Sequence, residues 1–325
     1  MRPFDLLQPT SVEGAVGLLA QHGDEARLIG GGAMLMILLR ERLIDPRYLI
    51  SVLNIAGLDD ISADDEGMSI GATATLGAME RSTQVREQYP VLAEALHLVG
   101  NVRVRNVATI GGHLAQADIH LDLPPVLVAL GASVIARGPV GERRIPLDEL
   151  VVGYYETALA PDEMLVSVRI PAPPAGLRGV YLKYCSLTPN DWPTVGVAAF
   201  IEREDGQRED GQREGGDHDG QADDRQADDR QANGGEPADG RAGNVRIVVG
   251  SVSERPLRLP EAEALLRGSR LTRGALAEVA RRYAAAAEPL ADVRGSVEYK
   301  RTITEVYVRR AVEAAAARAG LSIGE

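Results

Sequence analysis

Two glycine clusters about 80 residues apart carry the clearest chemical signal in this sequence of 325 residues. The first is Gly30-Gly31-Gly32, and the second is Gly111-Gly112. Glycine lets backbone amides approach an anion without a side chain in the way, and the dipole of a following helix favours negative charge. Two such turns can hold one pyrophosphate from opposite sides. The pair of clusters therefore indicates a dinucleotide cofactor.

Neither cluster fits the best-known nucleotide-binding motifs. A Gly-x-Gly-x-x-Gly fingerprint would need glycine where the chain has Leu35, and no Gly-Lys-Ser/Thr phosphate loop is present. A single Gly-Gly pair also marks an ordinary tight turn or bulge. If the chain binds a dinucleotide, we expect a fold other than the Rossmann fold.

Periodic patterns predict the elements that position the clusters. We expect each cluster to follow a short apolar strand. A capping box, with Thr10 as N-cap and Glu13 three residues on, begins a helix that runs to about residue 21. The continuous apolar start of a helix over residues 34–42 suggests that this helix is buried. The expected strands are 26–29, 48–52, 68–72, 133–136, 143–146, 164–170, 180–185, 194–202 and 244–252, and the further helices are 76–81, 90–99, 122–130, 260–266, 273–287 and 299–317.

This order of elements divides the chain into three units. A β-α-β opening forms a first lobe over residues 1–57, and mixed strands and helices form a second lobe over 58–173. The proline-rich stretch 171–174 is a stiff linker. Strands followed by helices indicate an α+β domain over residues 178–320.

Residues 202–243 interrupt the last unit. They hold 14 acidic residues and six arginines in short repeats and almost no apolar residue. Such a composition predicts a disordered acidic loop between two strands. A calcium-binding acidic repeat is the alternative, and the interspersed arginines oppose it.

Composition excludes several classes of function. Without residues 202–243 the formal net charge of −12 falls to −4, which argues against a nucleic-acid partner. No apolar run reaches the length of a membrane span, and the N-terminus does not read as a signal peptide. The single Cys185 forbids an internal disulfide and an iron–sulfur cluster bound by this chain alone. We expect a cytoplasmic protein.

The ordered motifs resemble one known family along most of the chain. The chain looks like the FAD-binding medium subunit of the molybdenum hydroxylases, the xanthine dehydrogenase and aerobic carbon monoxide dehydrogenase group. The resemblance runs from residue 3 to about residue 318, apart from the acidic insertion. The matching stretches are 29–36 with 45–50, 70–75, 109–112 with 122–125, 162–165 with 181–184, and 293–301.

The resemblance implies an α+β fold. It consists of a two-lobed FAD-binding domain of the PCMH/vanillyl-alcohol-oxidase type, followed by a small C-terminal α+β domain of the CO dehydrogenase flavoprotein type. It also implies a set of cofactor-binding residues and assigns no catalytic residue or metal ligand to this chain. The cofactor-binding set is Ile29, Gly30, Gly31, Gly32, Ala33, Met34, Leu35, Thr73, Thr109, Gly111, Gly112, Asp122, Leu165 and Lys183.

Individual residues of this set have expected roles. The glycines would contact FAD phosphates through their amides, and Thr109 would donate its hydroxyl. Asp122 would bind cofactor hydroxyls, a helix N-cap being its alternative role. Leu165 would face the cofactor with its backbone while its side chain joins the core. Lys183 would lie near the isoalloxazine ring and stabilise the anionic reduced flavin, its alternative being a solvated lysine at a strand edge.

The chain departs from the family pattern at two places. His113 stands where the family usually has Asn or Asp, and Asp118-Ile119 stands where it often has Ser-Pro. We expect Asp118 to point away from a phosphate or to bond a ribose hydroxyl. A surface or loop position is the ordinary role of His113, and we predict no covalent bond between it and the flavin.

The resemblance implies an electron-transfer subunit with noncovalent FAD. Its partners would be a large molybdopterin subunit and a small subunit with two [2Fe-2S] clusters, and the electron acceptor would be quinone, NAD or another molecule. A self-contained FAD-dependent reductase of the same fold is one alternative. A non-enzymatic assembly module that has lost FAD is another. The insertion contains no cysteine, which disfavours the subgroup that carries an extra cluster there.

Overall fold

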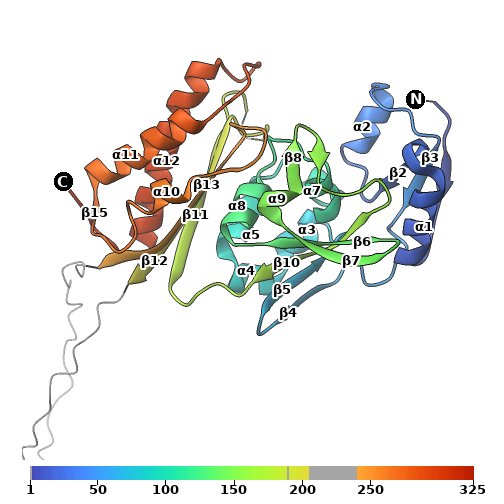
Figure 1. Cartoon of the computed structure of the whole chain (residues 1–325), viewed down its shortest axis with the longest axis horizontal. Coiled ribbons are helices and arrows are strands. Elements are labelled where there is room, and N and C mark those ends of the chain that lie inside the picture. The colour runs from blue at the N-terminus through green and yellow to red at the C-terminus, as the bar shows by residue number, and fades with distance from the viewer. Residues whose placement is uncertain (1, 189, 205–239) are drawn as a thin grey trace, which may run out of the picture.

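The computed structural model describes residues 2–188, 190–204 and 240–325. Its elements form three parts that follow one another along the molecule in chain order (Figure 1). Their main sheets lie within residues 5–51, 61–171 and 177–258. We propose that these parts correspond to the predicted units. None of the helices in the described ranges has the length and apolar character that crossing a bilayer requires.

The first lobe is a three-stranded parallel sheet of order β1-β3-β2. Parallel strands need crossover connections, and helices α1 and α2 supply them. Ser11, and not the predicted Thr10, caps α1, because its hydroxyl accepts a hydrogen bond from the Gly14 amide at 3.1 Å. The elements are β1 Asp5–Leu7, α1 Val12–His22, the 3-10 turn η1 Gly23–Glu25, β2 Ala26–Ile29, α2 Leu35–Arg40 and β3 Tyr48–Ser51.

The second lobe is a five-stranded antiparallel sheet of order β4-β5-β10-β6-β7, covered by helices. Its central strand β10 is buried on both faces. Met164 and Val166 pack into the core of the first lobe, whereas Leu165 and Val168 join the core of the second. The elements are β4 Ile61–Asp64, β5 Gly67–Gly71, α3 Leu76–Arg81, α4 Thr83–Gln88, α5 Pro90–Leu98, α6 Val102–Arg105, α7 Ile110–Ala115, α8 Leu123–Ala129, β6 Ser133–Gly138, β7 Gly141–Pro146, α9 Leu147–Leu150, β8 Val151–Gly153, β9 Glu156–Thr157 and β10 Met164–Pro171.

Two sequence-based expectations about the glycine clusters are wrong. The second cluster follows the short helix α6 and a turn, not a strand, because the Asn101 side chain accepts hydrogen bonds from two amides and caps that helix. Helix α2 is shorter than predicted and mostly uncovered. Only Leu39 in it is fully buried, and Ile37 is 51% exposed.

The C-terminal domain is a four-stranded antiparallel sheet with helices α11 and α12 on one face (Figure 1). Alternate residues of β12 face opposite sides: Val197 and Ala199 pack with α11 and α12, whereas Ala198 and Phe200 join the core of the second lobe. The sheet is therefore buried on both faces. The elements are β11 Leu177–Tyr184, β12 Val195–Glu204, β13 Arg241–Gly250, β14 Leu257–Arg258, α10 Pro260–Glu263, β15 Leu271–Thr272, α11 Arg273–Ala286, α12 Val297–Arg318 and β16 Ile323–Gly324.

The acidic insertion enters and leaves at one end of this sheet. Strands β12 and β13 pair up to Glu204 opposite Arg241. The predicted disorder over residues 202–243 is wrong at both ends, because residues 202–204 belong to β12 and residues 241–243 to β13. The rest of that prediction falls on residues 205–239, which lie outside the described residues.

Candidate cofactor-binding site

The fold brings the predicted turns together. Residues 72–75 and 108–111 run side by side, with Thr75 opposite Thr109 in an isolated bridge. The Ile110 amide donates to the Ala74 carbonyl at 3.0 Å, and the Gly111 amide donates to the Ala72 carbonyl at 2.8 Å. The second glycine cluster is thereby fixed to the end of β5.

The first cluster packs directly against residues 107–109, which lead into the second cluster. A Cβ atom on Gly31 would lie 2.5 Å from the carbonyl carbon of Val107 and closer still to its oxygen, and one on Gly30 would lie 2.9 Å from the Thr109 hydroxyl. No real Cβ atom comes that close to another backbone. Gly32 has φ of +70°, a conformation that favours glycine. Glycine is therefore required where the two turns meet.

The first turn leaves a run of backbone donors unused. The amides of residues 31–35 donate no hydrogen bond to any residue that the structure describes. These residues are half-buried, and they lead into α2. Because half-buried amides normally find partners, an exposed run of donors at the start of a helix suits a negatively charged group. The turn therefore fits the phosphates that the sequence predicts.

The second turn differs, because its amides are already engaged. Gly111 donates to Ala72, and the Gly112 amide donates to the Thr109 hydroxyl at 3.2 Å, so that Thr109 caps α7. A Cβ on Gly111 would lie 2.8 Å from two atoms of Ala72. In this structure the second cluster packs against Ala72 and Thr109, and residues 107–109 just before it pack closely against the first turn. Contact between its own amides and a phosphate stays a prediction.

His113 offers a further unused polar atom beside this turn. Its Nε2 is buried and has no hydrogen-bond partner among the described residues. Burial lowers the pKa of His113 to about 4, against the opposing effect of Asp118, so the ring is neutral at pH 7. A neutral imidazole can present either an N–H donor or an acceptor at Nε2. Asp118 itself is turned to His120, accepting from its backbone amide at 2.9 Å and lying 3.1 Å from Nδ1.

Asp122 and Lys183, which lie 61 residues apart in sequence, form a buried pair. Lys183 Nζ donates to Asp122 Oδ2 at 3.0 Å and to the Leu98 carbonyl at 2.9 Å, and Tyr181 donates its hydroxyl to Oδ1 at 2.8 Å. The two charged side chains are 4% and 3% exposed. Asp122 stands at the N-cap position of α8, but its side chain caps no amide. Both alternative roles, a helix N-cap for Asp122 and a solvated lysine for Lys183, are therefore wrong.

Opposing effects set the pKa of Asp122, and with it the charge of the carboxyl group. Burial raises its pKa to about 6, and the contacts with Lys183 and Tyr181 keep that pKa from rising further. Lys183 faces the second lobe because it shares that face of β11 with Tyr181, whose ring lies in the core of that lobe. The pair therefore ties the second lobe to the C-terminal domain.

The remaining predicted residues lie around these groups. Thr73 is buried, and its amide donates to the Leu58 carbonyl at 2.7 Å. The Leu165 side chain joins the core, as predicted, and the expected contact of its backbone with the cofactor stays a prediction. Half-buried positions in or beside the first turn are occupied by Ile29, Ala33, Met34 and Leu35.

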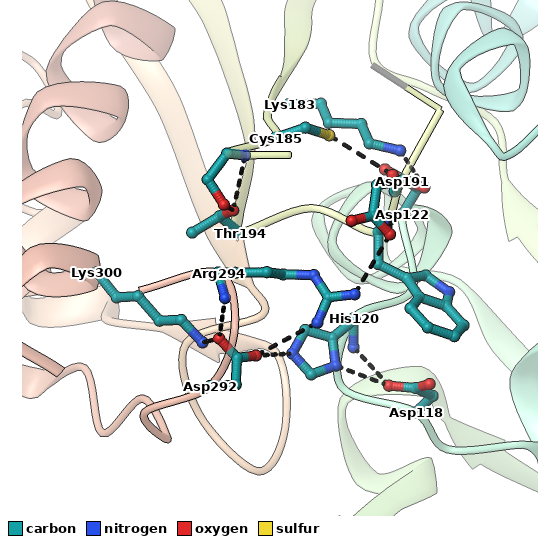
Figure 2. A network of polar contacts seen from close by, with 12 residues as sticks. Asp118, His120, Asp122, Lys183, Cys185, Asp191, Thr194, Asp292, Arg294 and Lys300 are labelled. Atoms are coloured by element: carbon teal, nitrogen blue, oxygen red, sulfur yellow. Dashed lines mark hydrogen bonds and ion pairs between the residues drawn. The ribbon is translucent and has the colours of Figure 1, made fainter. Parts of the chain in front are cut away.

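A second polar network crosses the same domain border (Figure 2). Asp292 pairs with Lys300 at 2.8 Å and faces His120 Nε2 at 3.6 Å. Arg294 reaches Asp191 at 3.3 Å and lies over the ring of Trp192. Sequence reasoning noted the stretch 293–301 only as a matching motif, and its contacts with the second lobe have no local signal. Among the described residues, no cluster of His, Cys, Asp or Glu is arranged to hold a metal ion.

Two surface pockets lie away from the predicted cofactor-binding residues. One of about 410 Å³ lies between α11 and α12, and one of about 420 Å³ lies between the first lobe and β9. No predicted cofactor residue lines either pocket. The candidate site is therefore identified by the backbone amides of the first turn that donate to no described residue and by the packing of the two turns, and not by either pocket.

Comparison with known proteins agrees with this arrangement. Residues 2–173 match the FAD binding domain in molybdopterin dehydrogenase, and residues 235–315 match the CO dehydrogenase flavoprotein C-terminal domain. The alpha subunit of the 6-hydroxypseudooxynicotine dehydrogenase complex of Paenarthrobacter nicotinovorans is 30% identical over 98% of this chain and 97% of its own length. The carbon monoxide dehydrogenase medium chain of Hydrogenophaga pseudoflava is 30% identical over 97% of this chain and 98% of its own length.

Solved structures give the same result. A structure of carbon monoxide dehydrogenase from Hydrogenophaga pseudoflava superposes with a TM-score of 0.84 at 32% identity, covering 98% of this chain and 99% of that chain. Quinoline 2-oxidoreductase from Pseudomonas putida 86 superposes with a TM-score of 0.83 at 27% identity, covering 98% and 99%. The two-lobed FAD-binding fold with its C-terminal α+β domain is confirmed. The chain thus belongs to the family of FAD-binding medium subunits of the molybdenum hydroxylases and is a subunit of an oxidoreductase.

Proposed function

We propose that this chain binds one noncovalent FAD and serves as the electron-outlet subunit of a molybdenum hydroxylase complex. In this proposal a large partner subunit holds the molybdopterin, and a small one holds two [2Fe-2S] clusters. Electrons reach FAD from the clusters and leave it for quinone, NAD or another acceptor. When bound, the flavin supplies the redox chemistry; the protein supplies its position and electrostatic surroundings.

One observation carries the proposal: the amides of residues 31–35 donate to no described residue, and their turn packs closely against residues 107–109. Donors fixed in this way need no rearrangement to accept an anion. Asp122 is an acceptor for cofactor hydroxyls, and Lys183 supplies positive charge on the opposite side of the domain border. We assign these roles on the family match together with the burial of both groups.

The described residues also bear on the division of labour. They contain no metal-binding cluster, and the single cysteine of the sequence cannot hold a [2Fe-2S] cluster. Substrate oxidation is therefore assigned to the partner chains. A cytoplasmic location stays part of the proposal, supported by the low cysteine content.

An affinity tag on the full-length chain tests this function. The chain, expressed together with its genomic neighbours, should co-purify with a large and a small subunit, with molybdenum and iron. Denaturation should release FAD, not FMN, at one molecule per tagged chain. The chain purified alone should hydroxylate no aldehyde, aromatic or carbon monoxide substrate. Hydroxylation by the single chain, or tagged complex without FAD, would overturn the proposal.

A further inference from the structure

The contacts of Asp122 point to a residue that acts on the cofactor site through another residue. We propose that Tyr181 is a positioning residue, whose hydroxyl fixes the orientation and the charge of the Asp122 carboxylate for hydrogen bonding to FAD hydroxyls. The inference rests on the proposed FAD site and goes beyond it. Tyr181 belongs to the C-terminal domain, whereas Asp122 opens α8 in the FAD-binding domain.

Each oxygen of the Asp122 carboxylate accepts a hydrogen bond from a different donor. Tyr181 occupies Oδ1 at 2.8 Å, and Lys183 occupies Oδ2 at 3.0 Å. Lys183 is itself held by the Leu98 carbonyl at 2.9 Å. A carboxylate bonded at one oxygen alone can rotate about its last torsion, which is soft, whereas one bonded at both oxygens is fixed. Each oxygen keeps a lone pair for a further donor.

The sheet keeps space for the Tyr181 hydroxyl. Gly196 of β12 stands opposite Lys183 in the pairing register. A Cβ atom on Gly196 would press against the Tyr181 hydroxyl and lie 3.1 Å from Cζ of the ring. Any larger residue there would push the hydroxyl off its place. The glycine at this position is thus explained by the orientation of Tyr181.

The charge of Asp122 depends on the same hydrogen bond. In the described residues, the ionisable groups that act on this carboxyl are Lys183 and Tyr181 of β11, and the thiol of Cys185 lies just beyond them; α5 contributes the Leu98 carbonyl. Burial raises the pKa of Asp122, and the Tyr181 hydrogen bond opposes that rise. Loss of the hydroxyl therefore moves the pKa upward and leaves less carboxylate at neutral pH.

The test compares three variants of the full-length protein in the complex in which it is isolated. FAD is removed and titrated back between pH 5 and pH 8.5, with flavin fluorescence as the readout. For Tyr181→Phe we expect the Kd for FAD to rise about tenfold at pH 7 and the pH midpoint of binding to move upward. Gly196→Ala keeps the hydroxyl but displaces it, so it should change both quantities in the same direction.

Tyr283→Phe is the matched control. Tyr283 is also fully buried in the C-terminal domain, and its hydroxyl donates to the Ile247 carbonyl at 2.7 Å, away from Asp122. Tyr283→Phe should lose about as much stability as Tyr181→Phe, yet it should keep the wild-type pH midpoint of FAD binding. Wild-type Kd and midpoint in both Tyr181→Phe and Gly196→Ala would overturn this inference alone. Wild-type protein that binds no FAD would overturn the proposed function and this inference with it.

Discussion

Replacing Gly31 by alanine should open the gap between the two glycine turns. The added Cβ would lie 2.5 Å from the carbonyl carbon of Val107, whereas carbon atoms in contact need about 3.5 Å. Both groups belong to the backbone, so no rotamer change relieves the overlap. The carbonyl oxygen would overlap the Cβ even more, so the turns must separate by more than about 1 Å, which moves the amides of residues 31–35 away from their place. Overpacking of this kind costs about 1–3 kcal/mol.

Two measurements follow for Gly31→Ala. The Tm of the FAD-free protein should fall by roughly 2–8 °C. The Kd for FAD should rise at least about tenfold, because one charge-assisted hydrogen bond to a phosphate contributes about 1.5–3 kcal/mol. Gly17→Ala is the control, since a Cβ there has open space and gains helix propensity in α1. Wild-type Tm and Kd in Gly31→Ala would refute the packing of the two turns and the role of the first.

Three further perturbations are predicted from the described contacts. Replacing residues 205–240 by Asn-Gly should leave FAD content unchanged and move the Tm by only a few degrees, since Glu204 and Arg241 already pair; loss of folding would contradict this. His113→Leu should weaken FAD binding about tenfold whereas His113→Asn restores it, and equal Kd values would remove His113 Nε2 from the site. Lys183→Met should lower the flavin reduction potential and cost about 3–5 kcal/mol of unfolding free energy at pH 8 but clearly less at pH 5, measured in urea; an equal cost at both pH values would contradict the pairing.

The sign of that pH dependence follows from Asp122. Its folded pKa of about 6 lies above the ordinary value of 3.8, so its stabilising contribution is complete below that ordinary value and is lost as the pH rises through about 6. Without Lys183 the folded pKa rises further, because only protonation then removes the buried charge. The variant is therefore penalised most at high pH.

Much of the fold was predictable because its signals are local. Short apolar runs located the long strands of the C-terminal sheet, and the long C-terminal helices were recognised. Local signals failed where two neighbours compete. Thr10 and Ser11 both suit an N-cap, and the sequence has no means of choosing between them. The alternating residues 102–105, Val-Arg-Val-Arg, look like a strand, yet the Asn101 cap makes them a helix.

The members of the candidate site stay a prediction, but the structure shows how two of its glycines are packed. Glycine at positions 31 and 111 was expected to let amides approach a phosphate; in the structure both glycines also lie against neighbouring backbone, at Val107 and Ala72. The Gly111 amide is engaged by the Ala72 carbonyl, a group 39 residues earlier that only the fold brings near. In the same way, the alternative of a solvated Lys183 stayed open because a strand pattern cannot reveal that another domain covers that face.

The two turns have different roles: the first offers backbone donors, and the second, with the residues just before it, supports the first by packing. The amides of the first turn donate to no described residue, whereas the second turn donates its own to Ala72 and Thr109. Gly30 and Gly31 pack on residues 107–109, next to that bonded turn. The Asp122–Lys183 pair combines support and free bonding capacity in a similar way. Each charged group is neutralised by the other across the domain border, and each retains capacity for a further hydrogen bond. Because the pair is drawn from two domains, the charge at the proposed FAD site depends on how the C-terminal sheet packs against α8. We therefore predict that a change at that border alters FAD binding even where it contacts no cofactor atom.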